Sequence, residues 1–185
     1  MRVKGNVLLA RKGFVEKHFG KGAWDKVLDA LPESDKTLLR GLVLNVGWFP
    51  FKLAETLDRT IVDRLGNGQE RVFEEIGRIS AEENLGGVHR NFLKPGDPQA
   101  FLAQTPEIYG FYYDTGRRVY EPNGPLAGTL TTYDADTFSA VDCLTIVGWH
   151  KQALAMCGAR DISIREQTCR AVGGKYCRYE LAWKI

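Results

Sequence analysis

The last fifty residues of the chain constrain its fold more than any other stretch. Residues 137–157 carry apolar side chains at helical spacing, which predicts one long helix. Apolar residues then alternate over residues 162–164 and again, strictly, over residues 177–185, which is typical of two half-buried strands. Two adjacent glycines lie between them. We therefore expect a helix followed by a β-hairpin at this end of the chain.

The residues before this segment predict a second hairpin and a helical N-terminal part. Residues 118–121 and 126–133 flank a Pro-Asn-Gly-Pro turn and are typical of paired strands. Upstream, apolar residues recur at helical spacing in these segments: 3–19, 24–31, 34–42, 50–65, 70–85 and 105–113. We predict a single α+β domain, 1–185. Its helical part covers 1–117, and in its ββαββ part, 118–185, the two hairpins form a four-stranded antiparallel sheet.

Composition and charge exclude some classes of partner. A chain of 185 residues is long enough to bury the core of one domain. Lys and Arg number 25 against 23 Asp and Glu, so the net charge is only +2, and the two signs are interspersed. A nucleic-acid-binding protein usually carries a basic patch, and none is visible here. We therefore expect no nucleic-acid partner.

The N-terminus gives no sign of export or membrane insertion. Its apolar run, Val7–Ala10, has four residues, whereas a secretory signal needs about 7–15 and a membrane span about 20. We expect a cytoplasmic protein without a membrane span, in which thiols stay reduced. The cysteines are then metal ligands, catalytic groups or small buried hydrophobic residues.

Spacing separates the four cysteines. Cys143 and Cys157 lie fourteen residues apart on one predicted helix, so about 21 Å of axial rise keeps them from sharing a metal. Cys157 is therefore interpreted as a packing residue. The hairpin returns Cys169 beside Cys177, and a loop of odd length, which pairs Ala171 with Cys177, would place both thiols on one face.

Glu166 completes a candidate metal site with Cys143, Cys169 and Cys177. Glu166 and Cys169 are three residues apart, which a regular strand would place on opposite faces, so the site requires a bulge or turn between them. Three thiolates and one carboxylate satisfy tetrahedral Zn²⁺ and leave no open position, which is typical of a structural site. The alternative is a group of buried thiols without metal.

The opening VKGNVLLARKGFVEKHFGKGAWDKVLDAL and the closing CRAVGGKYCRYEL resemble the 4-vinyl-reductase-type domains. These are similar in fold to haem-NO-binding domains and TRAPP transport-complex subunits, and the whole chain resembles a bacterial paralogous family of single-domain proteins. In sensory domains of this type from phenol-responsive transcriptional activators, Cys, Glu, Cys and Cys hold zinc, with the spacing of Glu166, Cys169 and Cys177 and a first Cys on the preceding helix. The resemblance thus implies zinc on these three residues and Cys143.

The resemblance to haem-NO-binding domains implies an iron-ligating His on the helix before the first strands. Tyr109 occupies the corresponding place, and the three histidines, His18, His89 and His150, lie elsewhere. We therefore expect no haem. An enzyme is not expected either, because Cys143 and His150, seven residues apart on one helix, are separated by about 10 Å, too far for a nucleophile and its base.

Aromatic residues supply the remaining site hypothesis. An apolar ligand pocket with orienting hydroxyls would be lined by Trp48, Phe51, Tyr109, Tyr112 and Tyr113, although the same residues could be plain core. The first functional hypothesis is a non-enzymatic sensory module with a structural zinc site, which binds a small apolar or aromatic ligand and signals through a protein partner. It requires a cavity of about 300 Å³ or more.

The second hypothesis is a scaffold subunit without a ligand, similar to a TRAPP-like homodimer. It requires exposed apolar residues, which we expect within Leu42–Phe51 or on the final strand.

Overall fold

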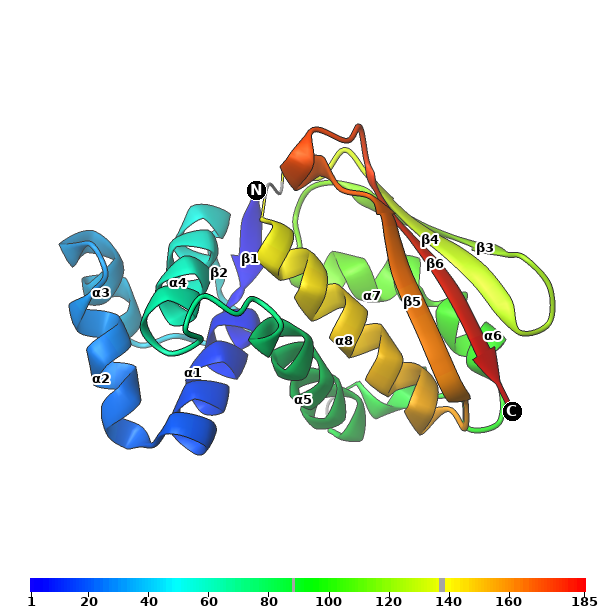
Figure 1. Ribbon diagram of the computed structural model, residues 1–185, viewed down its shortest axis with the longest axis horizontal. Coiled ribbons are helices and arrows are strands. Elements are labelled where there is room, and N and C mark those ends of the chain that lie inside the picture. The colour runs from blue at the N-terminus through cyan, green and yellow to red at the C-terminus, as the bar shows by residue number, and fades with distance from the viewer. Residues whose placement is uncertain (88, 137–138) are drawn as a thin grey trace.

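The computed structural model describes residues 1–87, 89–136 and 139–185. Figure 1 shows a helical N-terminal lobe beside a sheet that is covered by helices. The lobe is built from β1 (Arg2–Lys4), α1 (Gly5–Phe19), α2 (Lys21–Asp29), α3 (Glu33–Arg40), β2 (Trp48–Pro50) and α4 (Phe51–Arg64). β1 and β2 form a small antiparallel ribbon that connects the start of α1 to the start of α4.

The rest of the chain forms the sheet and its cover. The helices are α5 (Val72–Gly86), α6 (Pro98–Leu102), α7 (Thr105–Tyr112) and α8 (Ala140–Met156), with 3-10 turns at Arg90–Phe92 and Arg170–Val172. The strands are β3 (Arg117–Pro122), β4 (Ala127–Tyr133), β5 (Arg160–Thr168) and β6 (Cys177–Lys184). The sheet order is β3-β4-β6-β5, and every neighbouring pair is antiparallel. The predicted α+β class and four-stranded antiparallel sheet are confirmed.

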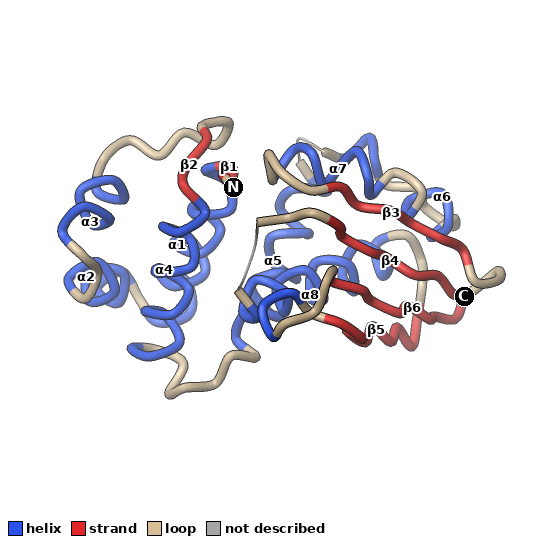
Figure 2. Tube along the Cα trace, turned by 90° about the horizontal axis from the view of Figure 1, so that it is seen from above, coloured by secondary structure: helices blue, strands red, loops and turns tan. Residues whose placement is uncertain are grey.

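Alternation along β6 decides which face of the sheet is buried. Tyr179, Leu181 and Trp183 are buried while the residues between them are exposed. Leu130 on β4 pairs directly with Tyr179 and is buried too. Figure 2 shows α8 and α7 on the same side of the sheet, against β5 and β3 respectively. The apolar face of the sheet therefore packs on these two helices.

Two glycines allow α5 and α8 to approach each other closely. A Cβ atom on Gly77 would overlap the carbonyl oxygen of Thr145, and one on Gly148 would overlap that of Glu74. The contact is reciprocal, since each helix contributes one glycine and one carbonyl. The backbones of α5 and α8 are therefore in direct contact.

A buried polar network joins the N-terminal lobe to α8. Arg11 on α1 is 2% exposed and donates from Nε to Asp58 Oδ1 (2.9 Å) on α4 and from Nη2 to Asp142 Oδ1 (3.1 Å) on α8. Tyr113 OH donates to Asp142 Oδ2 at 3.1 Å. One cation thus faces two carboxylates, and burial raises the pKa of Asp58 to about 6 although Arg11 opposes this shift.

The element boundaries differ from the prediction at both ends of the chain. Residues 2–4 form a strand, because Val3 pairs with Phe49, a partner too distant in sequence for helical spacing to indicate. α6 was not predicted. The predicted helix 137–157 began at residues 137–138, which lie outside the described part of the chain, and α8 begins at Ala140, where the Ser139 side chain accepts a hydrogen bond from Asp142 N.

Within the described residues, no helix has the length and apolarity needed to cross a membrane.

Candidate functional site

The structure brings the four predicted metal ligands together at one point. The ligand atoms of Cys143, Glu166, Cys169 and Cys177 all lie within 4.8 Å of one another. Cys143 Sγ is 3.6 Å from Cys169 Sγ and 3.9 Å from Cys177 Sγ. Tetrahedral zinc with bonds to sulfur of about 2.3 Å separates its sulfurs by about 3.8 Å. The sulfur spacing is therefore that of a tetrahedral thiolate site, and the metal itself stays a prediction.

Three elements position these ligands, which we call the four-residue cluster. Cys143 lies in the first turn of α8, Glu166 near the end of β5, and Cys177 at the start of β6. The register of β5 on β6 shifts between Glu166 and Thr168, so the irregularity that the site required between Glu166 and Cys169 is present. The thiols are buried, and Glu166 is exposed.

The loop expected between the two cysteines is different. Strand pairing ends at Thr168 and Arg178, so Ala171 does not pair with Cys177, and that prediction is wrong. A 3-10 turn over Arg170–Val172 fills the connection instead, with Arg170 N donating to Cys177 Sγ at 3.4 Å. Cys169 is therefore placed near Cys177 by this turn and not by strand pairing. Rules that relate hairpin loop length to strand pairing cannot predict such a turn.

Hydrogen bonds join the thiol of Cys143 to those of Cys169 and Cys177. Hydrogen bonding of the Cys143 thiol to Cys169 and Cys177, together with burial, raises the pKa of Cys143. The same bond from Cys143, with the one from Arg170 N, lowers the pKa of Cys177 to about 7. One sulfur is therefore close to the thiolate form that binds metals.

Cys157 lies apart from the cluster, buried at the far end of α8, and its carbonyl accepts from Gly96 N.

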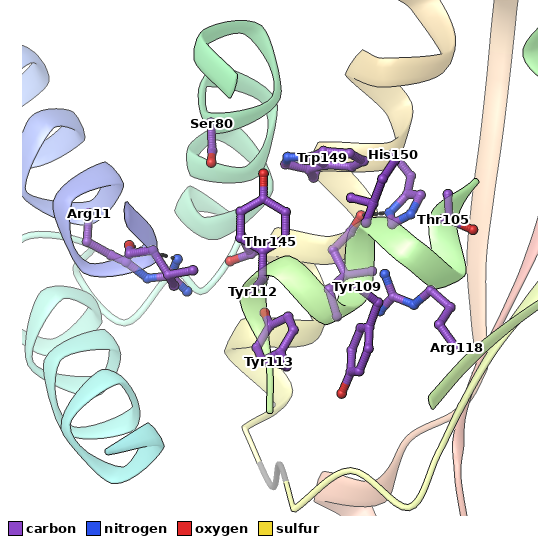
Figure 3. A pocket seen from close by; sticks show the side chains of 13 residues that line it. Arg11, Ser80, Thr105, Tyr109, Tyr112, Tyr113, Arg118, Thr145, Trp149 and His150 are labelled. Carbon is purple, nitrogen blue, oxygen red and sulfur yellow. Dashed lines mark hydrogen bonds between the residues drawn. The ribbon is translucent and has the colours of Figure 1, made fainter. Parts of the chain in front are cut away.

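A cavity lies next to the cluster, between α1, α5, α7, α8 and β3. Its volume is about 50 Å³, well below the ~300 Å³ that a drug-sized ligand needs. Figure 3 shows the side chains that form its wall. The residues that matter most for its chemistry are Tyr109, Tyr112, Arg118, Thr145, Trp149 and His150.

The aromatic residues predicted for a pocket divide into two groups. Tyr109, Tyr112 and Tyr113 line the cavity. Trp48 does not, because it lies on β2 with its ring 3.8 Å from Lys4 Nζ. Phe51 is buried at the start of α4, where its ring centroid is 6.5 Å from that of Tyr113. Phe51 therefore belongs to the core between the N-terminal lobe and α7.

Unpartnered polar atoms are concentrated on this cavity wall. Tyr112 OH, Arg118 Nη2, Thr145 Oγ1 and His150 Nε2 are buried without a hydrogen-bond partner among the described residues. Buried polar atoms normally have a partner in the protein, in ordered water or in a ligand. Four such atoms around one cavity indicate a place that receives polar groups from outside the chain.

His150 has a fixed tautomer in this wall. Its Nδ1 lies 2.8 Å from the Ile146 carbonyl, which can only accept, so Nδ1 carries the proton and Nε2 is a free acceptor. Burial, and then the charge of Arg118, lowers the pKa of His150 to about 3, so the ring is neutral. Tyr109 directs its hydroxyl elsewhere, donating to the Thr115 carbonyl at 2.9 Å.

The sequence interpretation did not assign His150 to a pocket. It considered only the helix before the first strands, whereas α8 forms the opposite wall and turns His150 inward. Arg118 was missed as well, since nothing in the spacing of β3 marks a buried arginine. A charged residue at an inward strand position is the signal that could have found it, because such residues are rarely buried without a reason.

Comparisons with known proteins give a structural likeness only. No protein-family profile and no curated protein sequence matches the chain. Solved structures do match. The H-NOX protein from S. oneidensis in the Fe(II)NO state is 14% identical, with a TM-score of 0.73 over 98% of this chain and 99% of that one. The Fe(II) unliganded H-NOX protein from K. algicida is 13% identical, with a TM-score of 0.73 over 98% and 97%.

A third H-NOX structure, solved to examine haem distortion in that family, is 12% identical with a TM-score of 0.75 over 98% of this chain and 95% of that one. These findings correct the prediction that no haem is expected, because the proteins with this fold are described in haem and Fe(II) states. They do not show zinc.

The cavity fits a haem in one respect and not in another. His150 Nε2 is a neutral, unpartnered nitrogen of the kind that ligates iron. The volume of about 50 Å³ is far below what a macrocycle occupies, so a haem would require the wall side chains to move. At 12–14% identity the likeness extends to architecture, and the chain has the fold of the H-NOX proteins.

Proposed function

We propose that this protein is a non-enzymatic sensory module that binds a small molecule between α5, α7 and α8 and signals through a protein partner. The observation that carries the proposal is the set of four unpartnered polar atoms, on Tyr112, Arg118, Thr145 and His150, around one cavity. Each unsatisfied buried group costs about 1–3 kcal/mol, so four of them around one cavity favour a site that is filled from outside the chain. The shared fold with H-NOX proteins, which are described with an iron-bound ligand, supports the same proposal.

The small cavity restricts the ligand. Its volume of about 50 Å³ does not reach the roughly 300 Å³ expected for a phenol-sized or larger apolar ligand with its contacts. The proposal therefore requires either a ligand of a few atoms or movement of wall side chains such as Tyr112 and Trp149.

The four-residue cluster is proposed as a structural zinc site. Cys143, Cys169, Cys177 and Glu166 fill all positions of a tetrahedral ion, so no position stays open for a catalytic water. Zinc bound there would attach the first turn of α8 to the β5–β6 hairpin. This supports a non-enzyme. It also fits the proposed cytoplasmic location, where thiols stay reduced, and the proposed placement of this single domain with the 4-vinyl-reductase-type domains.

Native mass spectrometry of protein purified without chelator, combined with a visible spectrum, tests both parts. We expect one zinc per chain and a retained or added small molecule that survives transfer. A Soret band would show that the bound molecule is a haem, and the sensory proposal would stand with a different ligand. Protein that carries no metal, and that binds none of a panel of small acids, phenols and haem, would contradict the proposal.

One exposed surface favours a second candidate function, that of a scaffold subunit that contacts another protein chain. Leu42, Leu44 and Val46, in the loop between α3 and β2, are 83%, 53% and 76% exposed. Three such residues in one loop are typical of a contact with another protein, and the scaffold hypothesis expected exposed apolar residues here. We propose that this loop contacts the signalling partner or a second copy of the chain. Light scattering of wild type and of a Leu42→Ser, Val46→Ser variant separates the two, because a homodimer would dissociate in the variant.

A further inference from the structure

Arg118 is a buried cation that forms no ion pair with the residues the structure describes. It extends from β3, is 8% exposed, and donates from Nε to Thr132 Oγ1 at 3.1 Å. Its guanidinium carbon lies 4.8 Å from the ring centroid of Tyr109. Nη2 is buried and has no hydrogen-bond partner among the described residues. Within the described part of the chain, the guanidinium thus contacts a hydroxyl and a ring face, both of them neutral.

Arg11 shows what a buried arginine normally requires. It is also nearly inaccessible, and it is paired with two carboxylates, Asp58 and Asp142. An arginine cannot lose its proton in a protein, and an unpaired buried charge is costly. Arg118 carries this cost at the wall of a cavity. An anion that enters the cavity would remove it.

His150 adds a second requirement on the ligand. Figure 3 shows the Arg118 guanidinium, from β3, and the His150 ring, from α8, turned toward each other across the cavity. His150 is 3% exposed, and its Nε2 is an acceptor that needs a donor. The wall therefore presents a charged donor and a neutral acceptor together. A molecule with a carboxylate and a hydroxyl is complementary to both.

We infer that the cavity binds a small hydroxy acid, whose carboxylate accepts from Arg118 Nη2 and whose hydroxyl donates to His150 Nε2. The inference rests on the proposed ligand-binding function and specifies its ligand class. The cavity of about 50 Å³ corresponds to roughly four water-sized groups. This is the scale of a two- or three-carbon acid such as glycolate or lactate. Ile108 and Trp149 supply apolar wall for a methyl group.

An alternative role for Arg118 is to balance the negative charge of the four-residue cluster. A second small cavity is lined by Arg118 together with Asp142, Cys143 and Cys177. Three thiolates and a carboxylate around a divalent ion keep a net negative charge, which Arg118 could balance from its other side. If that were its only role, an added acid would not bind and loss of the arginine would release metal.

Calorimetry on the metal-loaded, dialysed protein at pH 7 distinguishes these roles. The probes are glycolate, L-lactate, acetate, 1,2-propanediol and phenol. We expect both hydroxy acids to bind, acetate to bind about tenfold more weakly because Nε2 stays unpaired, and propanediol to give no binding heat. Arg118→Gln is expected to weaken hydroxy-acid binding at least about 30-fold, the effect of removing one side of a buried charged pair.

Arg117→Gln is the matched control. Arg117 is the preceding residue on β3, but it is exposed and contacts Tyr133 and Asp134 at the surface, so its variant should bind like wild type. The melting temperature and zinc content of both variants establish that they fold and keep the cluster intact. Wild-type binding by Arg118→Gln, or no binding of either hydroxy acid to wild type, would overturn the inference.

The probe panel also separates this inference from the proposed function. Binding of phenol without either acid would refute the ligand class and leave the sensory module standing. No binding by any probe, with no retained molecule in the mass spectrum, would refute both.

Discussion

Neutral His150 should make the protein less stable in mild acid. In the folded chain burial and Arg118 lower its pKa to about 3, whereas in the unfolded chain the imidazole has a pKa of about 6.5. Below pH 6.5 the unfolded state therefore takes up a proton that the folded state does not. The stabilisation from this group is complete above pH 6.5 and is lost progressively as the pH falls toward 3.

The size of the effect follows from the shift. Each pH unit between the two pKa values costs about 1.4 kcal/mol. At pH 5 the loss from His150 is therefore about 2 kcal/mol. Asp58 acts in the opposite direction, because its pKa is raised to about 6 in the folded chain. It adds stability on the order of 1 kcal/mol as the pH falls from 6 to 5, so the wild-type protein shows a partly cancelled change.

Urea unfolding of His150→Gln at pH 7 and pH 5, in chelator and reductant, isolates the histidine. Because Asp58 is unchanged, we expect the stability of the variant to fall by about 2 kcal/mol less between these pH values than that of wild type. His18→Gln, which removes an exposed histidine on α1, is the control for the substitution itself. Equal pH dependence in His150→Gln and wild type would refute a neutral His150 in the wall.

The remaining predictions concern the cluster, the helix contact and the buried network. Cys143→Ser should abolish the bound metal in native mass spectrometry, whereas Cys157→Ser should keep it, and metal loss in both would refute the assignment. Gly148→Ala should lower the unfolding free energy by at least about 1–3 kcal/mol through overlap with α5, while Gly13→Ala, which has open space, should be neutral or stabilising. Arg11→Met should cost about 3–5 kcal/mol in urea, because its two carboxylate partners stay buried; a loss below 1 kcal/mol would contradict the network.

The elements predicted correctly from the sequence are those in which apolar residues recur at a regular spacing. The strict alternation that ends at Trp183 and the helical spacing before Cys157 led to the sheet and to α8, because a half-buried strand and an amphipathic helix each leave a repeat in the chain. The β1–β2 ribbon was not predicted, since Val3 and Phe49 become neighbours only through the lobe between them.

The two candidate sites differ in the same way. The four-residue cluster was predicted because Glu166, Cys169 and Cys177 are chemically distinctive and their spacing resembles that of a zinc site in sensory domains of the 4-vinyl-reductase type. The cavity was found only in part. Arg118 and His150 come from a strand and a helix thirty-two residues apart, and their missing partners are a property of packing that no spacing shows.

α8 connects the three buried features through consecutive turns. Asp142 belongs to the Arg11 network, Cys143 is the next residue and belongs to the cluster, and Thr145 and His150 line the cavity. The helix cannot shift toward α5, because Gly148 already touches backbone there. A ligand that enlarges the cavity must therefore displace wall side chains such as Tyr112 and Trp149, or move α8 along its axis or tilt its first turn. The proposed metal at Cys143 would resist that movement, and the ion pairs of Arg11 with Asp142 and Asp58 would transmit the rest of it to α1 and α4. The N-terminal lobe, with its exposed apolar loop, is thus where binding would be detected by a partner.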